Sequence, residues 1–250
     1  MIETIKQDMC KSYKISYEEL SEAKIILNNH DENDNWNGIY VPLQYAQFED
    51  NSIIVSSFPR LATLVNTYIK LFEDDLFSEN ALAYLKDNLK DETAKMGLKP
   101  YSTPIINNDL YNIIYGIEDE KYLQKQKIQE STVQFLHDTK YKASNLSPGH
   151  VYFGTLIDGE IVSIVSTSLA TLEYPEVKII DIGVGTHENH RQKGYALSNI
   201  IAMSNYLLNN GHIVKYMCDN KNINSQKAAL SSGFEKIARE YLYRTKKFES

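Results

Sequence analysis

The sequence predicts an α/β protein with a mixed, mostly antiparallel sheet flanked by helices, preceded by a largely helical N-terminal region. Three observations support this prediction. In the N-terminal half, apolar residues recur at helical spacing. In the C-terminal half, two alternating apolar runs flank the dipeptide Asp158-Gly159, which is a strong signal for a two-residue hairpin turn. Further on, strand-like runs alternate with helical patterns that end at glycine, as in mixed α/β domains.

The N-terminal half contains three predicted helices and one predicted strand. Ser16-Tyr17-Glu18-Glu19 has the form of a capping box, and apolar residues follow at helical spacing as far as Leu27. Residues 29–37 are polar and are expected to form a loop, whereas residues 53–55 are expected to form a short strand. Pro59 can open a second helix, and a third is expected to begin near Ser78 and to stop at Gly97. No chemical motif is found in this half.

The C-terminal half is divided more clearly by glycines and polar turns. A helix is expected over residues 122–135, and the Asp158-Gly159 turn joins the first two of three strands. Asn210-Gly211 and Gly233 suit the left-handed position that ends a helix. The remaining elements are predicted to be strands at 151–157, 160–167, 177–186, 213–217 and 235–244, and helices from Arg191 to 210 and over 223–232.

Composition narrows the range of functions. The chain has 250 residues, 42% of them hydrophobic, and its formal net charge is −7. This acidic balance disfavours a nucleic-acid partner and accommodates a cationic small molecule better. No apolar run has the length of a membrane span, and the first residues lack the apolar core of a signal peptide, so we expect no membrane partner and a cytoplasmic protein. Cys10 and Cys218 could form at most one bridge, and reduced thiols agree with that location.

The most informative stretch is a hexapeptide that links a strand-like run to a helix. It reads Arg191-Gln192-Lys193-Gly194-Tyr195-Ala196. The first amide groups of a helix have no acceptor within the helix, and the helix dipole adds partial positive charge there. A glycine lets a ligand approach the backbone closely, and the two basic side chains add full charges. The sequence therefore predicts a site for a diphosphate at this helix start.

Two better-known phosphate motifs do not account for this stretch. Gly183-Val184-Gly185 lacks the third glycine of a dinucleotide fingerprint at the required place. A P-loop needs Gly-Lys followed by Ser or Thr, whereas Lys193 precedes Gly194. An ordinary strand–helix turn with a solvated basic pair is the remaining structural alternative.

The arrangement Arg191-x-x-Gly194-x-Ala196 after a strand resembles the acyl-CoA signature of the GCN5-related N-acetyltransferase (GNAT) superfamily. Asn222-x-x-Ser225, in a helix that closes with Gly233-Phe234, resembles the second CoA motif of that family. The resemblance covers roughly residues 120–250. It implies a GNAT acyl-CoA-binding domain over 119–250, with a helix-rich region of unknown role over 1–118. Within the superfamily, Cys218-Asp219-Asn220 and the Glu240-Tyr241 ending are similar to a bacterial subgroup of the zwittermicin-resistance type.

The resemblance implies that acetyl-CoA is the co-substrate and that no metal is needed. The backbone amides from Gln192 to Ala196 would bind the pyrophosphate, and the backbone of residues 184–186 would pair with the pantetheine arm. Asn222 would bind that arm, cap its helix, or do both, and Ser225 reads as a small packing residue. The predicted cofactor-binding residues are Val184, Gly185, Thr186, Arg191, Gln192, Lys193, Gly194, Tyr195, Ala196, Asn222 and Ser225.

The catalytic residues are less clearly marked. An ammonium group cannot attack a carbonyl, so a general base is needed. Asp181, on the strand that approaches the loop, is the predicted base, with His187, Glu188 and His190 as alternatives. Ala229 occupies the position where the family often has a tyrosine that acts as the general acid for the leaving thiolate. Tyr241 is the predicted substitute, with Tyr243 or departure of a free thiolate as alternatives, and Cys218 reads as a buried strand residue.

The predicted activity is transfer of an acetyl group from acetyl-CoA to a primary amine of a small molecule, directly within a ternary complex. The alternatives are N-acylation of a protein or peptide and a non-catalytic acyl-CoA sensor. The N-terminal region would wall one side of the acceptor cleft or mediate homodimerisation.

Overall fold

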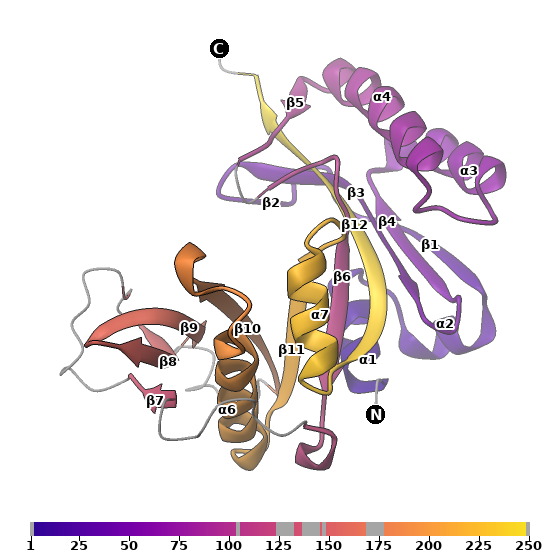
Figure 1. Ribbon diagram of the computed structural model, residues 1–250. Coiled ribbons are helices and arrows are strands. Elements are labelled where there is room, and N and C mark those ends of the chain that lie inside the picture. Colours follow the sequence, from indigo (N-terminus) through magenta and orange to yellow (C-terminus); the bar gives the residue numbers. More distant parts are fainter. Residues whose placement is uncertain are drawn as a thin grey trace. The chain divides into compact units, whose positions relative to one another are not determined.

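The computed structural model describes residues 3–103, 106–123, 133–136, 146, 149–168 and 178–248 (Figure 1). The chain forms two compact units. The N-terminal unit consists of Lys6–Ile113, Asp219–Lys221 and Ala238 onward. The C-terminal unit consists of the residues up to Ile5, Ile114–Cys218 and Asn222–Ile237. The predicted division after residue 118 stays a prediction about separately folding domains.

The N-terminal unit combines a sheet with two pairs of helices. Its strands are ordered β1-β4-β3-β12, with β2 beside β3 and β5 beside β12. The β1–β4 pair is parallel and the other pairs are antiparallel. The elements are α1 (Glu3–Ser12), α2 (Tyr17–Glu22), β1 (Ile25–Asn29), β2 (Asn35–Trp36), β3 (Ile39–Phe48), β4 (Ile53–Ser57), η1 (Pro59–Leu61), α3 (Ala62–Leu71), α4 (Glu79–Lys95), β5 (Leu98–Pro100) and the later part of β12 (Glu235–Lys247).

One face of this sheet packs on α3 and α4 and forms the core of the unit. Side chains in a strand alternate between its two faces, and the core accordingly contains alternating residues of three strands: Leu43 and Tyr45, Ile53 and Val55, and Tyr241 and Tyr243. Tyr45 and Tyr68 are fully buried, and their hydroxyls are hydrogen-bonded to each other at 2.9 Å. The Tyr45 hydroxyl also donates to the carbonyl of Leu76 at 2.9 Å. Burying these polar groups is tolerated because each has a partner.

The expectation of a largely helical N-terminal region needs a correction. The helices at α2, α3 and α4 are confirmed, as is the strand at β4. The first predicted helix, however, ends at Glu22, and residues 25–29 form β1 instead of continuing it. The branched residues at 25 and 26 pair with residues 53 and 54 of β4, which favours the extended chain. The ten-residue strand β3 was not predicted at all.

The C-terminal unit follows the predicted order of elements closely. The hairpin at Asp158-Gly159 is confirmed, with both residues at positive φ (52° and 84°), as a type I′ turn requires. The elements are β6 (Asn112–Ile117, which begins in the N-terminal unit), η2 (Glu120–Tyr122), β7 (Val133–Phe135), β8 (His150–Ile157), β9 (Glu160–Ser168), β10 (Ile179–Thr186), η5 (Glu188–His190), α6 (Tyr195–Asn209), β11 (Ile213–Asp219) and α7 (Ile223–Ser231).

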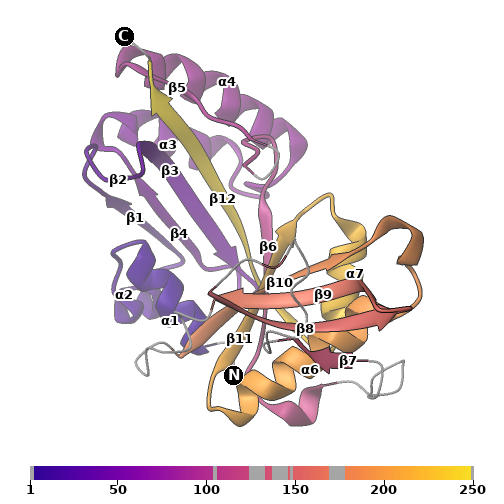
Figure 2. The same cartoon turned by 90° about the vertical axis from the view of Figure 1, so that its left-hand side faces the viewer.

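The sheet of this unit is mixed, as predicted. Its strands are ordered β6-β11-β10-β9-β8-β7 (Figure 2). The pairs from β10 to β7 are antiparallel, and β10 pairs with β11 in parallel. Helix α6 packs on β8, β9 and β10 and against α7. The prediction of a helix over 122–135 is wrong at its C-terminal end, because residues 133–135 form β7 by pairing with β8. Residues 124–132 of this predicted helix lie outside the described residues.

Cys10 and Cys218 are both buried, and neither forms a disulfide. No helix in the described part of the chain combines the length and the apolar character needed to cross a bilayer.

Candidate functional site

The start of α6 is an anion site made of backbone. Its N-cap is Gly194, and no described side chain caps the helix. The carbonyl of Gly194 accepts the first intrahelical bond, from the Ser198 amide at 3.1 Å, so the amides of residues 195–197 have no intrahelical acceptor. Helices α2, α4 and α7 differ, because Ser16, Ser78 and Asn222 cap them. An uncapped first turn is available to an external anion.

The loop before this helix is shaped by two left-handed residues. Gln192 has a φ of 63° and Gly194 a φ of 88°. Left-handed turns of this kind can direct successive amides to one point, and such concavities bind anions. The Arg191 side chain donates from Nε to the carbonyl of Thr186 at 3.3 Å, which ties the loop to the end of β10. The hexapeptide 191–196 therefore forms a left-handed turn at Gly194, as its glycine predicted.

The neighbouring strands separate beside this loop. The parallel pairing of β10 with β11 ends at Ile182 and Tyr216, although the strands continue to Thr186 and Asp219. On its other edge, β10 stays paired with β9 from Gly183 to Thr186. The β11-facing edge of Val184–Thr186 therefore exposes main-chain groups to which an amide-rich ligand could add, as in strand addition.

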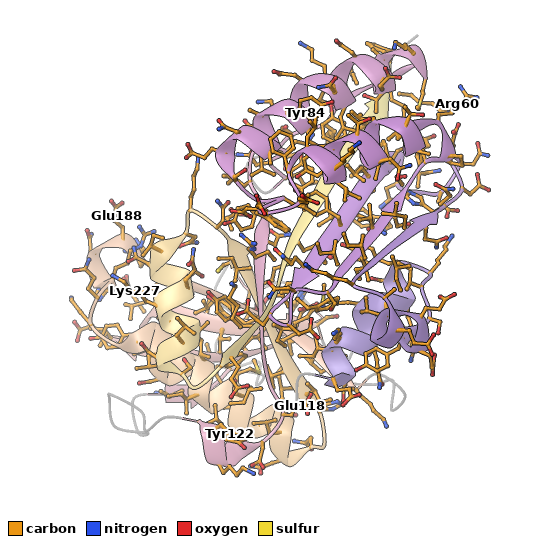
Figure 3. All side chains as sticks on the ribbon, turned by 90° about the vertical axis from the view of Figure 1, so that its right-hand side faces the viewer. Arg60, Tyr84, Glu118, Tyr122, Glu188 and Lys227 are labelled. Carbon is orange, nitrogen blue, oxygen red and sulfur yellow. The ribbon has the colours of Figure 1, made fainter. Side chains whose placement is uncertain are left out.

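Helix α7 borders the other side of this opening. The Asn222 side chain accepts from the Ser225 amide at 3.2 Å, so its capping role is observed and its predicted ligand role stays a prediction. The Ser225 hydroxyl lies 2.5 Å from the hydroxyl of Tyr216 on β11. Lys227 adds a cationic side chain from the same helix (Figure 3). The opening thus contains the Asn222 amide, the Tyr216 and Ser225 hydroxyls and the Lys227 ammonium.

These elements enclose a cleft of about 500 Å³. That volume is in the range of small-molecule sites. Of the eleven residues predicted to bind the cofactor, ten line this cleft, and Lys193 does not. The other lining residues are His190, Leu197, Tyr216, Asn224, Lys227, Ala228 and Ser231.

The two predicted catalytic residues do not line the cleft. Asp181 on β10 is ion-paired with Lys215 on β11, at 3.2 Å between Nζ and Oδ2, and its side chain is 61% exposed. Tyr241 belongs to the core of the N-terminal unit, where it is fully buried and donates its hydroxyl to the carbonyl of Asn108 at 2.9 Å. The assignment of Tyr241 as general acid is corrected on this ground, because its proton already has a partner away from solvent.

Two cleft residues suit those roles better. His190 was an alternative base, and its Nδ1 is shielded from solvent without a hydrogen-bond partner among the described residues. Such a buried ring nitrogen calls for an explanation. Tyr216 was not predicted, because no spacing marks it. Burial raises the pKa of Tyr216 and Cys218 raises it further, while the Ser225 hydrogen bond lowers it.

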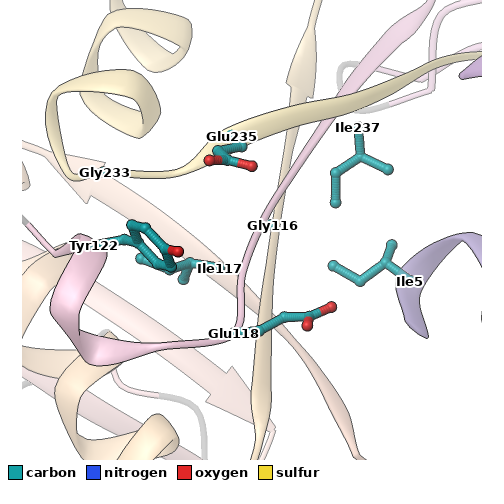
Figure 4. Close-up of a pocket in the computed structure, with 8 residues that line it drawn as sticks. All are labelled: Ile5, Gly116, Ile117, Glu118, Tyr122, Gly233, Glu235 and Ile237. Atoms are coloured by element: carbon teal, nitrogen blue, oxygen red, sulfur yellow. The ribbon is translucent and has the colours of Figure 1, made fainter. Parts of the chain in front are cut away.

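The Gly233-Phe234 ending has a packing role. Gly233 has a φ of 96°, and a Cβ there would lie 2.0 Å from the carbonyl oxygen of Tyr122. Figure 4 shows Gly233 and Tyr122 beside a cavity of about 10 Å³, together with Gly116. A Cβ on Gly116 would lie 2.3 Å from Cδ1 of Ile5. Gly233 thus allows the end of α7 to approach Tyr122 closely, and Gly116 allows β6 to pack closely on Ile5. Neither glycine lines the large cleft.

The similarity of this chain to known proteins is found among solved structures alone. No family model matches the chain, and no curated protein matches it. Among solved structures, 25 chains match. A GNAT-family protein from Novosphingobium aromaticivorans is 15% identical, with a TM-score of 0.43 over 61% of this chain and 73% of its own. A GCN5-related N-acetyltransferase-like protein from Streptococcus suis is 18% identical, with a TM-score of 0.42 over 62% and 67%.

A GCN5-related N-acetyltransferase from Sphaerobacter thermophilus is 11% identical, with a TM-score of 0.41 over 81% of this chain and 76% of its own. The names of these structures refer to the superfamily that the motifs resemble. At TM-scores below 0.5 the likeness is partial, and the residues of the cleft carry the functional conclusion. The zwittermicin-type subgroup stays a prediction.

Proposed function

We propose that this chain is a GNAT-type acyltransferase that moves an acetyl group from acetyl-CoA to a primary amine of a small molecule. The observation that carries the proposal is the uncapped start of α6 beside the separated strands β10 and β11. The amides of residues 195–197 would bind the pyrophosphate, and the free edge of Val184–Thr186 would pair with the pantetheine amides. The donor would thus be held mainly by the backbone.

The cleft offers a group for each proton transfer. His190 would take the proton from the ammonium, so that the amine nitrogen can attack the thioester carbonyl. The new C–N bond forms and the C–S bond breaks, and Tyr216 would donate its hydroxyl proton to the leaving thiolate. The raised pKa of Tyr216 keeps that proton in place at neutral pH. The nitrogen that has attacked would lose its second proton to the tyrosinate, which leaves a neutral amide, free CoA thiol and a restored Tyr216. A backbone amide of β10 would stabilise the oxyanion.

The charge of the chain indicates the class of acceptor. The net charge of −7 accommodates a cationic small molecule. Calorimetry with acetyl-CoA, followed by a thiol-release screen, tests the proposal. The panel contains polyamines, aminoglycosides, amino acids and peptides with free N-termini. We expect acetyl-CoA binding and turnover on a small amine. Absence of acetyl-CoA binding would contradict the whole proposal, turnover on peptides alone would indicate a peptide N-acyltransferase, and binding without turnover would indicate an acyl-CoA sensor.

Two variants test the proton transfers separately from binding. Tyr216→Phe keeps the ring and removes the proton, so kcat should fall while the affinity for acetyl-CoA stays within about twofold. His190→Gln should lower kcat, because the glutamine amide cannot accept the proton of the ammonium. An unchanged kcat in His190→Gln would return the role of base to Asp181.

A further inference from the structure

The N-terminal unit contains a second cleft, for which the proposed acyl transfer supplies no role. Its volume is about 410 Å³. It is lined by residues from α1, the α1–α2 turn, β2, β3, β4 and β12, with a few from the connecting loops. The lining residues are Ser12, Lys14, His30, Asp34, Asn35, Trp36, Ile39, Val41, Gln44, Ser56, Ile106 and Arg244.

The floor of this cleft is the sheet face opposite the apolar core. The residues that alternate with Leu43, Val55 and Tyr243 of that core include Gln44, Ser56 and Arg244. A sheet face beneath other elements is usually apolar, because apolar contacts stabilise the packing. Here three neighbouring strands each place a polar side chain in the cleft. Departures of this kind from the expected pattern are typical of functional sites.

A β-bulge marks the same place. The pairing of β12 with β3 passes from Tyr243 opposite Leu43 to Thr245 opposite Tyr40, so β3 has one residue more than β12 at Arg244. Bulges redirect side chains and occur beside binding sites. His30 holds the region together, because its ring nitrogens lie 2.9 Å from the carbonyl of Val41 and 2.8 Å from the Ser56 hydroxyl. Both nitrogens are therefore engaged in the structure of the floor.

Arg244 is the main charged group of the floor with hydrogen-bonding capacity left. Within the part of the chain that the structure describes, its guanidinium makes one long bond, from Nη1 to the carbonyl of Leu242 at 3.5 Å. Burial lowers the pKa of Arg244, whereas Glu240 raises it, and a guanidinium remains protonated in any case. The other cation, Lys14, is ion-paired with Asp34 at the rim, at 2.6 Å. Arg244 therefore offers a planar set of donors suited to a carboxylate.

An exposed aromatic ring stands at the mouth of the cleft. Trp36 is 72% exposed, although it lines the cleft. It is fixed by a two-residue hairpin, in which Asn37 and Gly38 have φ values of 50° and 76° and Trp36 pairs with Ile39. At the mouth of the cleft, its indole ring offers a flat apolar surface on which the ring of a planar ligand can stack.

We propose that this second cleft binds a small aromatic carboxylate, whose carboxylate group contacts Arg244 and whose ring packs on Trp36. Gln44 would hydrogen-bond a polar substituent, and the apolar side chains of Ile39, Val41 and Ile106 would enclose the ring edge. The inference is independent of the acyl-CoA cleft, because every residue involved belongs to the N-terminal unit.

Trp36 is the only tryptophan of the chain, so its fluorescence reports on this cleft directly. The intact protein is titrated with benzoate, phenylacetate and 3-phenylpropionate, and with benzamide and benzylamine as neutral and cationic counterparts. We expect a saturable change with at least one carboxylate, which binds at least about tenfold more tightly than benzamide and benzylamine. Calorimetry checks the same affinities without relying on fluorescence.

Variants then assign the contacts. Arg244→Gln should weaken carboxylate binding at least about tenfold. The affinity of Arg244→Lys should lie between those of the unmodified protein and Arg244→Gln, because lysine keeps the charge and loses the planar set of donors. Arg60→Gln removes an arginine of the same unit outside the cleft and should bind normally. Circular dichroism and acetyl-CoA affinity verify folding. The proposal is overturned if none of the carboxylates binds saturably, if benzamide binds as tightly as the carboxylates, or if the folded Arg244→Gln variant binds like the unmodified protein.

Discussion

The two clefts present different kinds of chemical group: one presents mainly main-chain groups and the other mainly side chains. In the C-terminal unit, the cleft presents main-chain groups: the uncapped first turn of α6 and the free edge of Val184–Thr186. In the N-terminal unit, the cleft presents side chains, chiefly Arg244, Gln44 and Trp36. A backbone site depends on the conformations that its glycines permit, whereas a side-chain site depends on the identity of each residue. The two clefts should therefore respond to different kinds of substitution.

The largest expected effect is that of Gly194→Val on acetyl-CoA binding. Gly194 has a φ of 88°, which a β-branched residue adopts only with strain, and the added side chain would stand where the pyrophosphate approaches. The affinity measured by calorimetry should fall by about 100-fold or more, which corresponds to about 2.7 kcal/mol. Arg191→Gln, which removes a full charge and leaves the backbone unchanged, should cost about tenfold or less. The reverse order would show that side-chain charge, and not the backbone, binds the donor.

A second effect concerns Gly233, whose role we assign to packing. In Gly233→Ala, the strained φ and the overlap with the Tyr122 carbonyl should lower the free energy of unfolding by about 2–3 kcal/mol in urea titrations. Gly211→Ala is the matched control, because Gly211 also has a positive φ (80°) but has open space around its missing Cβ. That variant should lose only about 1 kcal/mol. Equal losses at both positions would mean that the close approach of Tyr122 contributes nothing.

The elements that could be predicted from the sequence are those that local backbone chemistry determines. The hairpin at Asp158-Gly159 and the helix ends at Gly211 and Gly233 depend on residues that tolerate positive φ, and all three are confirmed. Strand β1 could not be predicted in this way, because its partner Ile53–Ser57 is distant in sequence. The Asn37-Gly38 turn is a missed signal, since this dipeptide is as clear a hairpin marker as Asp158-Gly159.

The residues of the candidate site also differ in how well they could be predicted from the sequence. Ten of eleven predicted cofactor residues lie together in one cleft, because the motif describes a strand–loop–helix segment whose geometry is local. The catalytic residues were harder to predict. Tyr216 lines the cleft from the last position of β11 that pairs with β10, and Tyr241 points into another core through the alternation of β12. Neither consequence can be read from spacing along the chain.

A third prediction separates the two roles of Asn222. In Asn222→Ala, loss of the side-chain bond to the Ser225 amide should lower the free energy of unfolding by about 1 kcal/mol. Asn222→Asp keeps an oxygen that can cap α7 but loses the amide donor, so stability should be retained while acetyl-CoA affinity falls several-fold. Thermal unfolding and calorimetry on both variants measure the two effects. If Asn222→Asp binds acetyl-CoA normally, Asn222 is a cap alone, and the site is more purely a backbone site than we propose.

The smallest effect lies in the N-terminal unit and concerns acid stability. Burial by itself would raise the pKa of Asp50, but the hydrogen bonds from Lys6 and Ser52 outweigh it and lower the pKa to about 2. Because the folded-state pKa lies below the ordinary value, the contribution of Asp50 to stability is complete above about pH 4 and is lost as the pH falls towards 2. The side chain is 59% exposed, so the contribution is limited to about 0.2–1 kcal/mol. Asp50→Asn should therefore unfold more easily at pH 7 and lose less stability between pH 4 and 2 than the unmodified protein. Trp36 fluorescence follows this unit specifically, and parallel pH profiles for the two proteins would refute the assignment.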